Sequence, residues 1–166
     1  AVEGSGRLAQ QAPDSARLVE LIGRSPIFRD LSQRDLAILA DGAHLRVEPV
    51  ERVVAQAGEA STSLFLVLEG LLTTEGHRRH GVRPGPAPLL RPGDLFDPRV
   101  ALLGEAHSCT VRTRTPALLC ELDQQALQRL FAGSAEAFRR VGLNLAQQSP
   151  VNGLGGGLGG SLGGGL

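Results

Sequence analysis

The sequence predicts an α+β domain in which helices precede and follow a block of short strands. Apolar residues recur at helical spacing before Gly42 and after Asp123, whereas the segment between them consists of short apolar or alternating runs separated by turn residues. This order of elements is typical of an α+β domain and not of the parallel α/β class. With 166 residues and an apolar fraction of 42%, the chain can bury one domain-sized core.

Two helices are expected first. The segment SARLVELIG places Leu18, Leu21 and Ile22 on one face, and Asp14 or Ser15 can cap the free amides at its start. The second helix has an S-x-x-D cap, apolar residues at helical spacing and a glycine stop. Its marker residues are Ser32, Asp35, Leu36, Leu39, Ala40 and Gly42.

Beyond Gly42 the period changes from helix to strand. Residues 44–76 contain several short strands with turn residues between them, which indicates a barrel, a roll or a sandwich. Residues 76–88 are rich in Pro, Gly and Arg, so they are expected to form a loop between strands. Strands resume at residues 108–114 and 117–122.

The chain is expected to close with two helices, and its ends differ in kind from its middle. Asp123 and Ser134 can cap these last helices. Residues 1–13 are small and polar, which predicts a flexible lead-in. Residues 149–166 are rich in Gly and Leu and are expected to be a flexible linker or tail, with a segment that orders on a docking partner as the open alternative. The domain itself is expected to span residues 14–148.

Composition and short motifs exclude several classes of function. The 17 basic and 17 acidic residues balance, which gives no indication of nucleic-acid or membrane contact, and no apolar run approaches the roughly 20 residues that span a bilayer. With no signal-peptide pattern at its start, the chain is expected to be soluble and cytoplasmic. Cys109 and Cys120 lack metal-ligand spacing and are expected to be a reduced pair, with a disulfide as the alternative. No metal site, no catalytic residue and no enzyme are predicted.

Several segments in a fixed order resemble the cyclic nucleotide-binding domain family. They are PIFRDLSQRDLAILADGAHLRVEPVE at residues 26–51, the Gly58-Glu59 turn, LFLVLEG at 64–70 and LRPGDLF at 90–96. The resemblance covers about residues 15–148. It implies an eight-stranded antiparallel β-roll, a double-stranded β-helix of jelly-roll type, flanked by N- and C-terminal helices. In that family a short helix between two strands carries the phosphate of a cyclic nucleotide, and such a helix start attracts anions.

The resemblance places the ligand site in residues 90–111, called the cassette below. Family members follow its phenylalanine with Gly-Glu, an apolar residue and Ala-Leu, and later show an Arg before a Thr-Val strand. Here Asp97 stands at the glycine, Pro98 or Arg99 stands at the glutamate that grips the ribose, and His107 stands at the arginine. The candidate ligand-binding residues are Asp97, Pro98, Arg99, Val100, Ala101, Leu102, His107, Ser108, Cys109 and Thr110.

The two missing side chains predict weak binding. A charge-assisted hydrogen bond is worth about 1.5–3 kcal/mol, so the loss of the arginine is expected to weaken phosphate binding by about one to two powers of ten. The missing glutamate adds a similar penalty. His107 substitutes only when protonated, which is the minority state of a histidine at pH 7. Two places for Arg99 stay open, one in the pocket and one in solvent.

The expected function is that of a regulatory domain in a larger protein, with weak or altered binding of a cyclic nucleotide, cyclic AMP or cyclic GMP. The alternative is a degenerate, ligand-free module used for docking or assembly, for example as an inserted domain. A homo-oligomer is left open. The helices are expected to end near Gln148, before a glycine-rich stretch, so no DNA-reading element and no contact with nucleic acid or membrane are expected in this chain.

Overall fold

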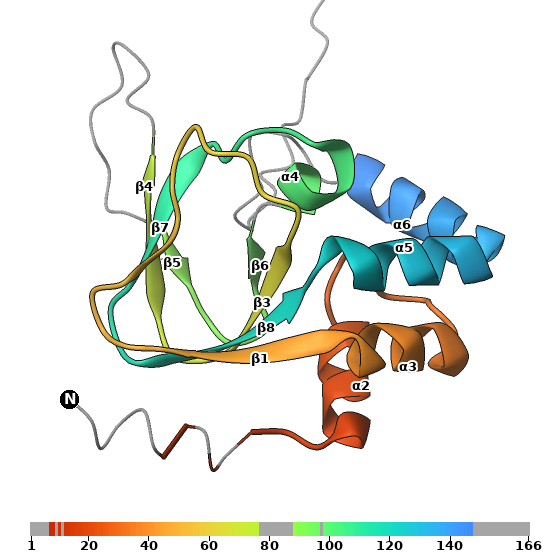
Figure 1. Ribbon diagram of the computed structural model, residues 1–166, viewed down its shortest axis with the longest axis horizontal. Coiled ribbons are helices and arrows are strands. Elements are labelled where there is room, and N and C mark those ends of the chain that lie inside the picture. Colours follow the sequence, from red (N-terminus) through yellow and green to blue (C-terminus); the bar gives the residue numbers. More distant parts are fainter. Residues whose placement is uncertain (1–6, 9, 11, 77–87, 97, 148–166) are drawn as a thin grey trace, which may run out of the picture.

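The computed structural model describes residues 7–8, 10, 12–76, 88–96 and 98–147. In this part of the chain eight strands form two four-stranded antiparallel sheets. The first sheet has the order β1 (Ala43–Glu48), β8 (Ala117–Leu122), β3 (Leu64–Glu69), β6 (Leu95–Phe96). The second has the order β2 (Val53–Ala55), β7 (Cys109–Thr113), β4 (Leu72–Gly76), β5 (Leu89–Leu90). The predicted α+β fold, an eight-stranded β-roll with flanking helices, is confirmed (Figure 1).

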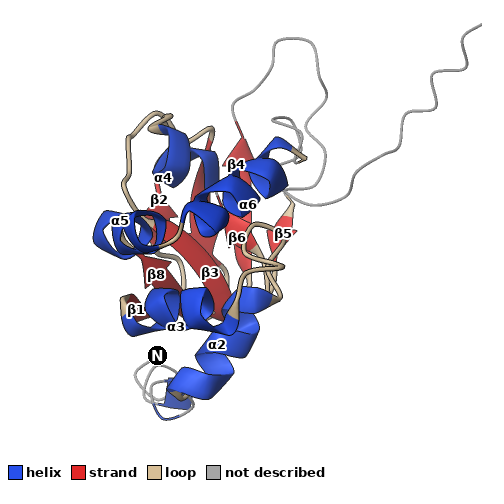
Figure 2. Ribbon diagram, turned by 90° about the vertical axis from the view of Figure 1, so that its right-hand side faces the viewer, coloured by secondary structure: helices blue, strands red, loops and turns tan. Residues whose placement is uncertain are grey.

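The helices gather on one side of the roll. Figure 2 shows them over the sheet that contains β1, β8 and β3, while a short helix lies between β6 and β7. The helices are α2 (Ser15–Gly23), α3 (Gln33–Asp41), α4 (Pro98–Leu103), α5 (Gln124–Gly133) and α6 (Ala135–Ala146).

The predicted helix caps are present. Each capping oxygen accepts a hydrogen bond from the backbone N–H three residues further on, at 2.8–3.1 Å. These caps satisfy amides that the first turn of a helix leaves without a partner, which is why short polar side chains fix the helix starts. The four capping residues are Asp14, Ser32, Asp123 and Ser134.

Strand β3 divides the core into two clusters. Leu64 and Leu66 belong to the cluster beneath the helices, whereas Phe65 and Val67 belong to the cluster inside the roll. Successive side chains of a strand point to opposite faces, and here both faces are covered, so the strand is apolar on both sides. The Glu69-Gly70 turn that follows needs glycine, because its φ is +97° and an added Cβ would lie 2.6 Å from a backbone oxygen of Pro116.

The two cysteines lie in different strands and are not joined in a disulfide, as the sequence predicted. Cys109 belongs to the cluster inside the roll and Cys120 to the cluster beneath the helices. Burial raises the pKa of the Cys120 thiol to about 12, so this thiol stays protonated and packs as a small apolar side chain.

Parts of the predicted domain boundaries lie outside the described residues. This holds for residues 1–6 of the expected lead-in and for the Gly/Leu-rich tail, residues 149–166. Within the lead-in, Arg7, Leu8 and Gln10 have helical backbone. In the described part, no helix is both long enough and apolar enough to cross a membrane.

Candidate functional site

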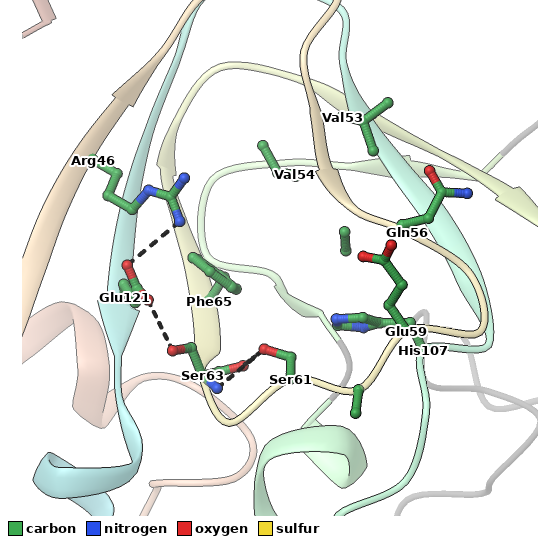
Figure 3. Close-up of a pocket in the computed structure, with 12 residues that line it drawn as sticks. Arg46, Val53, Val54, Gln56, Glu59, Ser61, Ser63, Phe65, His107 and Glu121 are labelled. Atoms are coloured by element: carbon green, nitrogen blue, oxygen red, sulfur yellow. Dashed lines mark hydrogen bonds and ion pairs between the residues drawn. The ribbon is translucent and has the colours of Figure 1, made fainter.

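A cavity of about 280 Å³ lies at one end of the roll, between the two sheets (Figure 3). On one side it is lined by the strand wall, defined as Arg46 of β1, Ser63 and Phe65 at the start of β3, and Glu121 of β8. The other side is formed by β2 and the loop that follows it, together with His107 just before β7. Figure 3 shows the charged and hydroxyl groups of the two sides facing each other across this space.

The register of the first sheet explains why charged residues of β1 and β8 face inward. Arg46 pairs with Leu119, and Glu121 pairs with Phe65. Residues directly opposite each other in an antiparallel ladder share a face of the sheet. Because Leu119 and Phe65 belong to the cluster inside the roll, Arg46 and Glu121 lie on that inner face as well.

The strand wall holds a network of charges. The Arg46 guanidinium donates to Glu48 Oε1 over 2.7 Å and to Glu121 Oε2 over 3.5 Å. It also lies 5.5 Å from the centroid of the Phe65 ring, within the range of a cation–π contact. Ser63 Oγ donates to the other oxygen of Glu121 over 2.8 Å. The arginine therefore has one close carboxylate and one distant one.

Most described residues of the short helix α4 are part of the packing and do not line this cavity. Pro98 and Val100 are buried, while Ala101 and Leu102 pack against the cluster beneath the helices. Asp97 lies outside the described residues. Helix α4 thus connects the roll to the flanking helices, and its apolar side chains pack in that contact.

The structure places Arg99 outside the cavity lining, with 36% of its side chain exposed to solvent. Its guanidinium donates to both oxygens of Glu105, over 3.1 and 2.9 Å, in a bidentate pair. This contact raises the pKa of Arg99 and lowers that of Glu105. Arg99 does not line the cavity, so in this structure the cassette arginine does not replace the one that the family carries at His107.

The four predicted residues around the start of β7 have different environments. The Thr110 hydroxyl accepts hydrogen bonds from the Ala57 N–H and the Gln56 side-chain amide, over 3.1 and 3.2 Å. Cys109 is buried inside the roll, and Ser108 is exposed. Among the described candidate residues, His107 is the one that lines the cavity.

His107 joins the two loops beside the cavity. Its backbone N–H donates to the carbonyl of Glu59 over 2.9 Å, and its carbonyl accepts from the N–H of Gly58 over 2.8 Å. The side chain is 6% exposed. The Gly58-Glu59 turn, part of the family resemblance, is thus held against the entry to β7, and Glu59 lies beside the imidazole (Figure 3).

The strand wall was not predicted from the sequence. Charged residues that alternate along a strand usually indicate a solvent face, and Arg46 and Glu48 have that spacing. Only the pairing of β1 with β8, more than 70 positions away, shows that they face into the roll. The signal that the sequence did contain was Arg46 itself, an arginine within residues 26–51, one of the segments that resemble the family.

A second cavity and possible metal ligands are the other binding features to consider in the described residues. A second cavity of about 500 Å³ lies between α2 and the β5–β6 turn, but no predicted ligand-binding residue lines it. In the part of the chain that the structure describes, no group of three or more His, Cys, Asp or Glu side chains is arranged to hold a metal ion.

An antiparallel roll with a cavity between its sheets and a short helix between β6 and β7 defines a class of β-roll domains. The family model of the cyclic nucleotide-binding domain matches residues 46–134, and the chain belongs to this family. Domains of this kind in regulators have sensor or regulatory roles and are not enzymes, in agreement with the sequence prediction.

Known relatives agree with this assignment. The HTH-type transcriptional regulator Cmr of Mycobacterium tuberculosis is 31% identical over 140 residues, which are 84% of this chain and 54% of the relative. The chain therefore spans about half the length of that curated relative. Among solved structures, a cyclic nucleotide-binding domain from Methylobacillus flagellatus has a TM-score of 0.64 at 18% identity, covering 80% of this chain and 74% of its own.

A regulatory domain of Toxoplasma gondii PKA, solved with cAMP, has a TM-score of 0.62 at 20% identity. The match covers 72% of this chain and 46% of that one. At these identities the two solved structures show the shared fold.

Proposed function

We propose that this chain is the regulatory domain of a larger protein and that a small ligand binds in the cavity between its sheets, with weak or altered affinity for cyclic nucleotides. Family membership and the presence of the cavity support a ligand-sensing role. One observation supports altered affinity: His107 lines the cavity where the family carries an arginine, while Arg99 is paired with Glu105 outside it.

The size of the cavity fits a ligand no larger than a mononucleotide. At about 280 Å³ it is slightly smaller than the range of about 300–1,000 Å³ that small-molecule sites occupy. A cyclic mononucleotide, cyclic AMP or cyclic GMP, is the ligand class that the family suggests. With histidine in place of arginine at position 107, we expect the affinity for a cyclic nucleotide to be lower by about one to two powers of ten.

The helices that follow the roll offer a route for a signal. Ser134 Oγ donates to Asp35 of α3 over 3.0 Å, and the Asn144 amide donates to the carbonyls of Ile27 and Arg29 over 3.0 and 3.1 Å. These bonds connect α5 and α6 to the helices before the roll. A ligand shifts such a contact only if it binds one arrangement of the helices better than another.

A transcriptional regulator is the kind of parent protein that we propose. The curated relative is described as an HTH-type transcriptional regulator, and this chain spans 54% of it. The expectation that the domain itself does not contact nucleic acid remains a prediction, as does its oligomeric state.

Calorimetric titration of the chain with cyclic AMP and cyclic GMP tests the proposed function. We expect saturable heat with one site per chain. The absence of heat at millimolar concentrations of both nucleotides would contradict it.

The second candidate is a ligand-free module used for docking or assembly. The observation that favours it is the exposure of two large apolar side chains of α6, Phe138 at 64% and Leu143 at 48%. Large exposed apolar side chains of this kind mark interaction surfaces when they lie together. A domain that binds neither nucleotide and self-associates through α6 in sedimentation experiments is the outcome that this candidate predicts.

A further inference from the structure

The strand wall places a cation in the cavity, whereas Arg99 of the cassette lies outside the cavity lining. Among the described residues that line the cavity, Arg46 is the one arginine. It lies on the inner face of the roll, and 42% of its side chain is exposed. A guanidinium carries five N–H donors in a fixed fork and matches the geometry of a phosphate or a carboxylate. Arg46 therefore offers a small anion a partner on the side opposite to His107.

We propose that Arg46 holds the anionic group of the ligand and that Glu121 is a built-in competitor, whose carboxylate occupies Arg46 until the ligand displaces it. The ligand class is a small organic anion with a phosphodiester or carboxylate group. This inference rests on the proposed function, because it assigns the ligand contacts within the same cavity.

The two carboxylates that flank Arg46 have unequal roles. Glu48 is only 10% exposed and lies 2.7 Å from the guanidinium, so this close pair holds Arg46 in place. Glu121 is more accessible, at 21%, and its distance of 3.5 Å is at the outer limit of a hydrogen bond. The guanidinium edge that faces Glu121 is therefore the edge that an incoming anion takes.

When a ligand displaces the Glu121 carboxylate from Arg46, the carboxylate keeps a hydrogen-bond partner. Ser63 Oγ donates to Oε1 of Glu121 over 2.8 Å, whereas Arg46 contacts Oε2. The carboxylate therefore retains one hydrogen bond after the exchange, which lowers the cost of breaking its contact with the arginine. Phe65 lies beneath the guanidinium in both states, because its position depends on stacking with Phe96.

The negative charge of Glu121 is expected to weaken the binding of an anion in the cavity. The described lining holds one arginine, Arg46, and two carboxylates, Glu59 and Glu121. A ligand anion at Arg46 lies close to the Glu121 carboxylate. Like charges this close repel each other, so removal of the Glu121 charge is expected to strengthen anion binding about tenfold, which corresponds to about 1.4 kcal/mol.

The test compares cyclic AMP binding by calorimetry among the wild-type chain and the variants Glu121→Gln, Arg46→Gln and the double variant. Glutamine keeps an acceptor for Ser63, so the fold is preserved, and thermal melting checks this. We expect Glu121→Gln to bind about tenfold more tightly and the double variant to lose that gain, because the gain acts through Arg46. The matched control is Glu75→Gln, which removes a strand carboxylate paired with Arg112 and not part of the cavity lining; its affinity is expected to equal that of the wild type.

Each outcome separates this inference from the proposed function. Tighter binding by Glu121→Gln supports the inference, even if the wild-type chain gives no measurable heat and the proposed function fails. A wild-type chain that binds while Glu121→Gln binds equally or more weakly overturns the inference and leaves the proposed function intact. A gain that persists in the double variant also overturns it, and so does the absence of binding by both the wild type and Glu121→Gln.

Discussion

The cassette and the strand wall each carry an arginine paired with a glutamate, but only one pair lines the cavity. In the cassette, Arg99 and Glu105 form a bidentate pair that does not line it. In the strand wall, Arg46 and Glu121 are held at 3.5 Å within the lining. The difference teaches that an arginine–glutamate pair in the cassette can stabilise local structure outside the cavity, while a similar pair on the opposite side places its charges in the cavity lining.

Packing and hydrogen bonding account for the shape of the cassette. Phe96 is 1% exposed and stacks on Phe65 with the ring centroids 5.1 Å apart, and Val100 is 3% exposed. The Thr110 hydroxyl holds the loop that follows β2. Substitutions in the cassette are therefore expected to reduce stability, and substitutions in the strand wall to change ligand affinity.

The largest expected effect is a loss of stability when the buried phenylalanine of the cassette is removed. Phe96→Ala removes a fully buried ring and should lower the free energy of unfolding by about 3–5 kcal/mol. Urea denaturation measures it. The control is Phe138→Ala on the exposed surface of α6, where we expect a loss of at most about 1 kcal/mol. If the two variants lose equal stability, the cassette is not the structural element described here.

An intermediate effect is expected at Thr110. Thr110→Val removes the acceptor of the Ala57 N–H and the Gln56 amide, which should cost about 1–3 kcal/mol of unfolding free energy. Thr110→Ser keeps the hydroxyl and should cost less. Ligand affinity, measured by calorimetry on the folded variant, should stay unchanged. A loss of affinity without a loss of stability would show that this hydroxyl contacts the ligand instead.

The smallest effect is expected at Arg99. Arg99→Ala breaks an ion pair whose partners are largely exposed to solvent, so we expect no measurable loss of stability and unchanged nucleotide binding. The comparison is Arg46→Gln, which should weaken binding. If Arg99→Ala abolishes binding and Arg46→Gln does not, the roles assigned to the two arginines are reversed.

Features that depend on neighbouring residues could be predicted from the residues themselves, whereas the contacts of Arg46 with a distant strand could not. The caps at Asp14, Ser32, Asp123 and Ser134 depend on neighbouring residues, so they were found directly. The strand arrangement followed from the family resemblance. The inward face of Arg46 depends on its register with β8, and no local pattern carries that information.

The same dependence on long-range contacts explains why most of the described candidate site residues do not line the cavity. The resemblance identified the cassette by its order along the chain, yet of its described candidates His107 lines the cavity. Val100 and Thr110 are used for packing and for a loop contact. Distinguishing a ligand contact from a structural one requires the neighbours that folding brings together.

The most direct test of the central claim is a titration of the isotope-labelled chain with cyclic AMP, followed by the amide resonances in nuclear magnetic resonance spectra. The account predicts that the largest shifts occur at Arg46, Ser63 and Glu121, with His107 shifting across the cavity. Shifts confined to residues 98–103, with the strand wall unchanged, would contradict it.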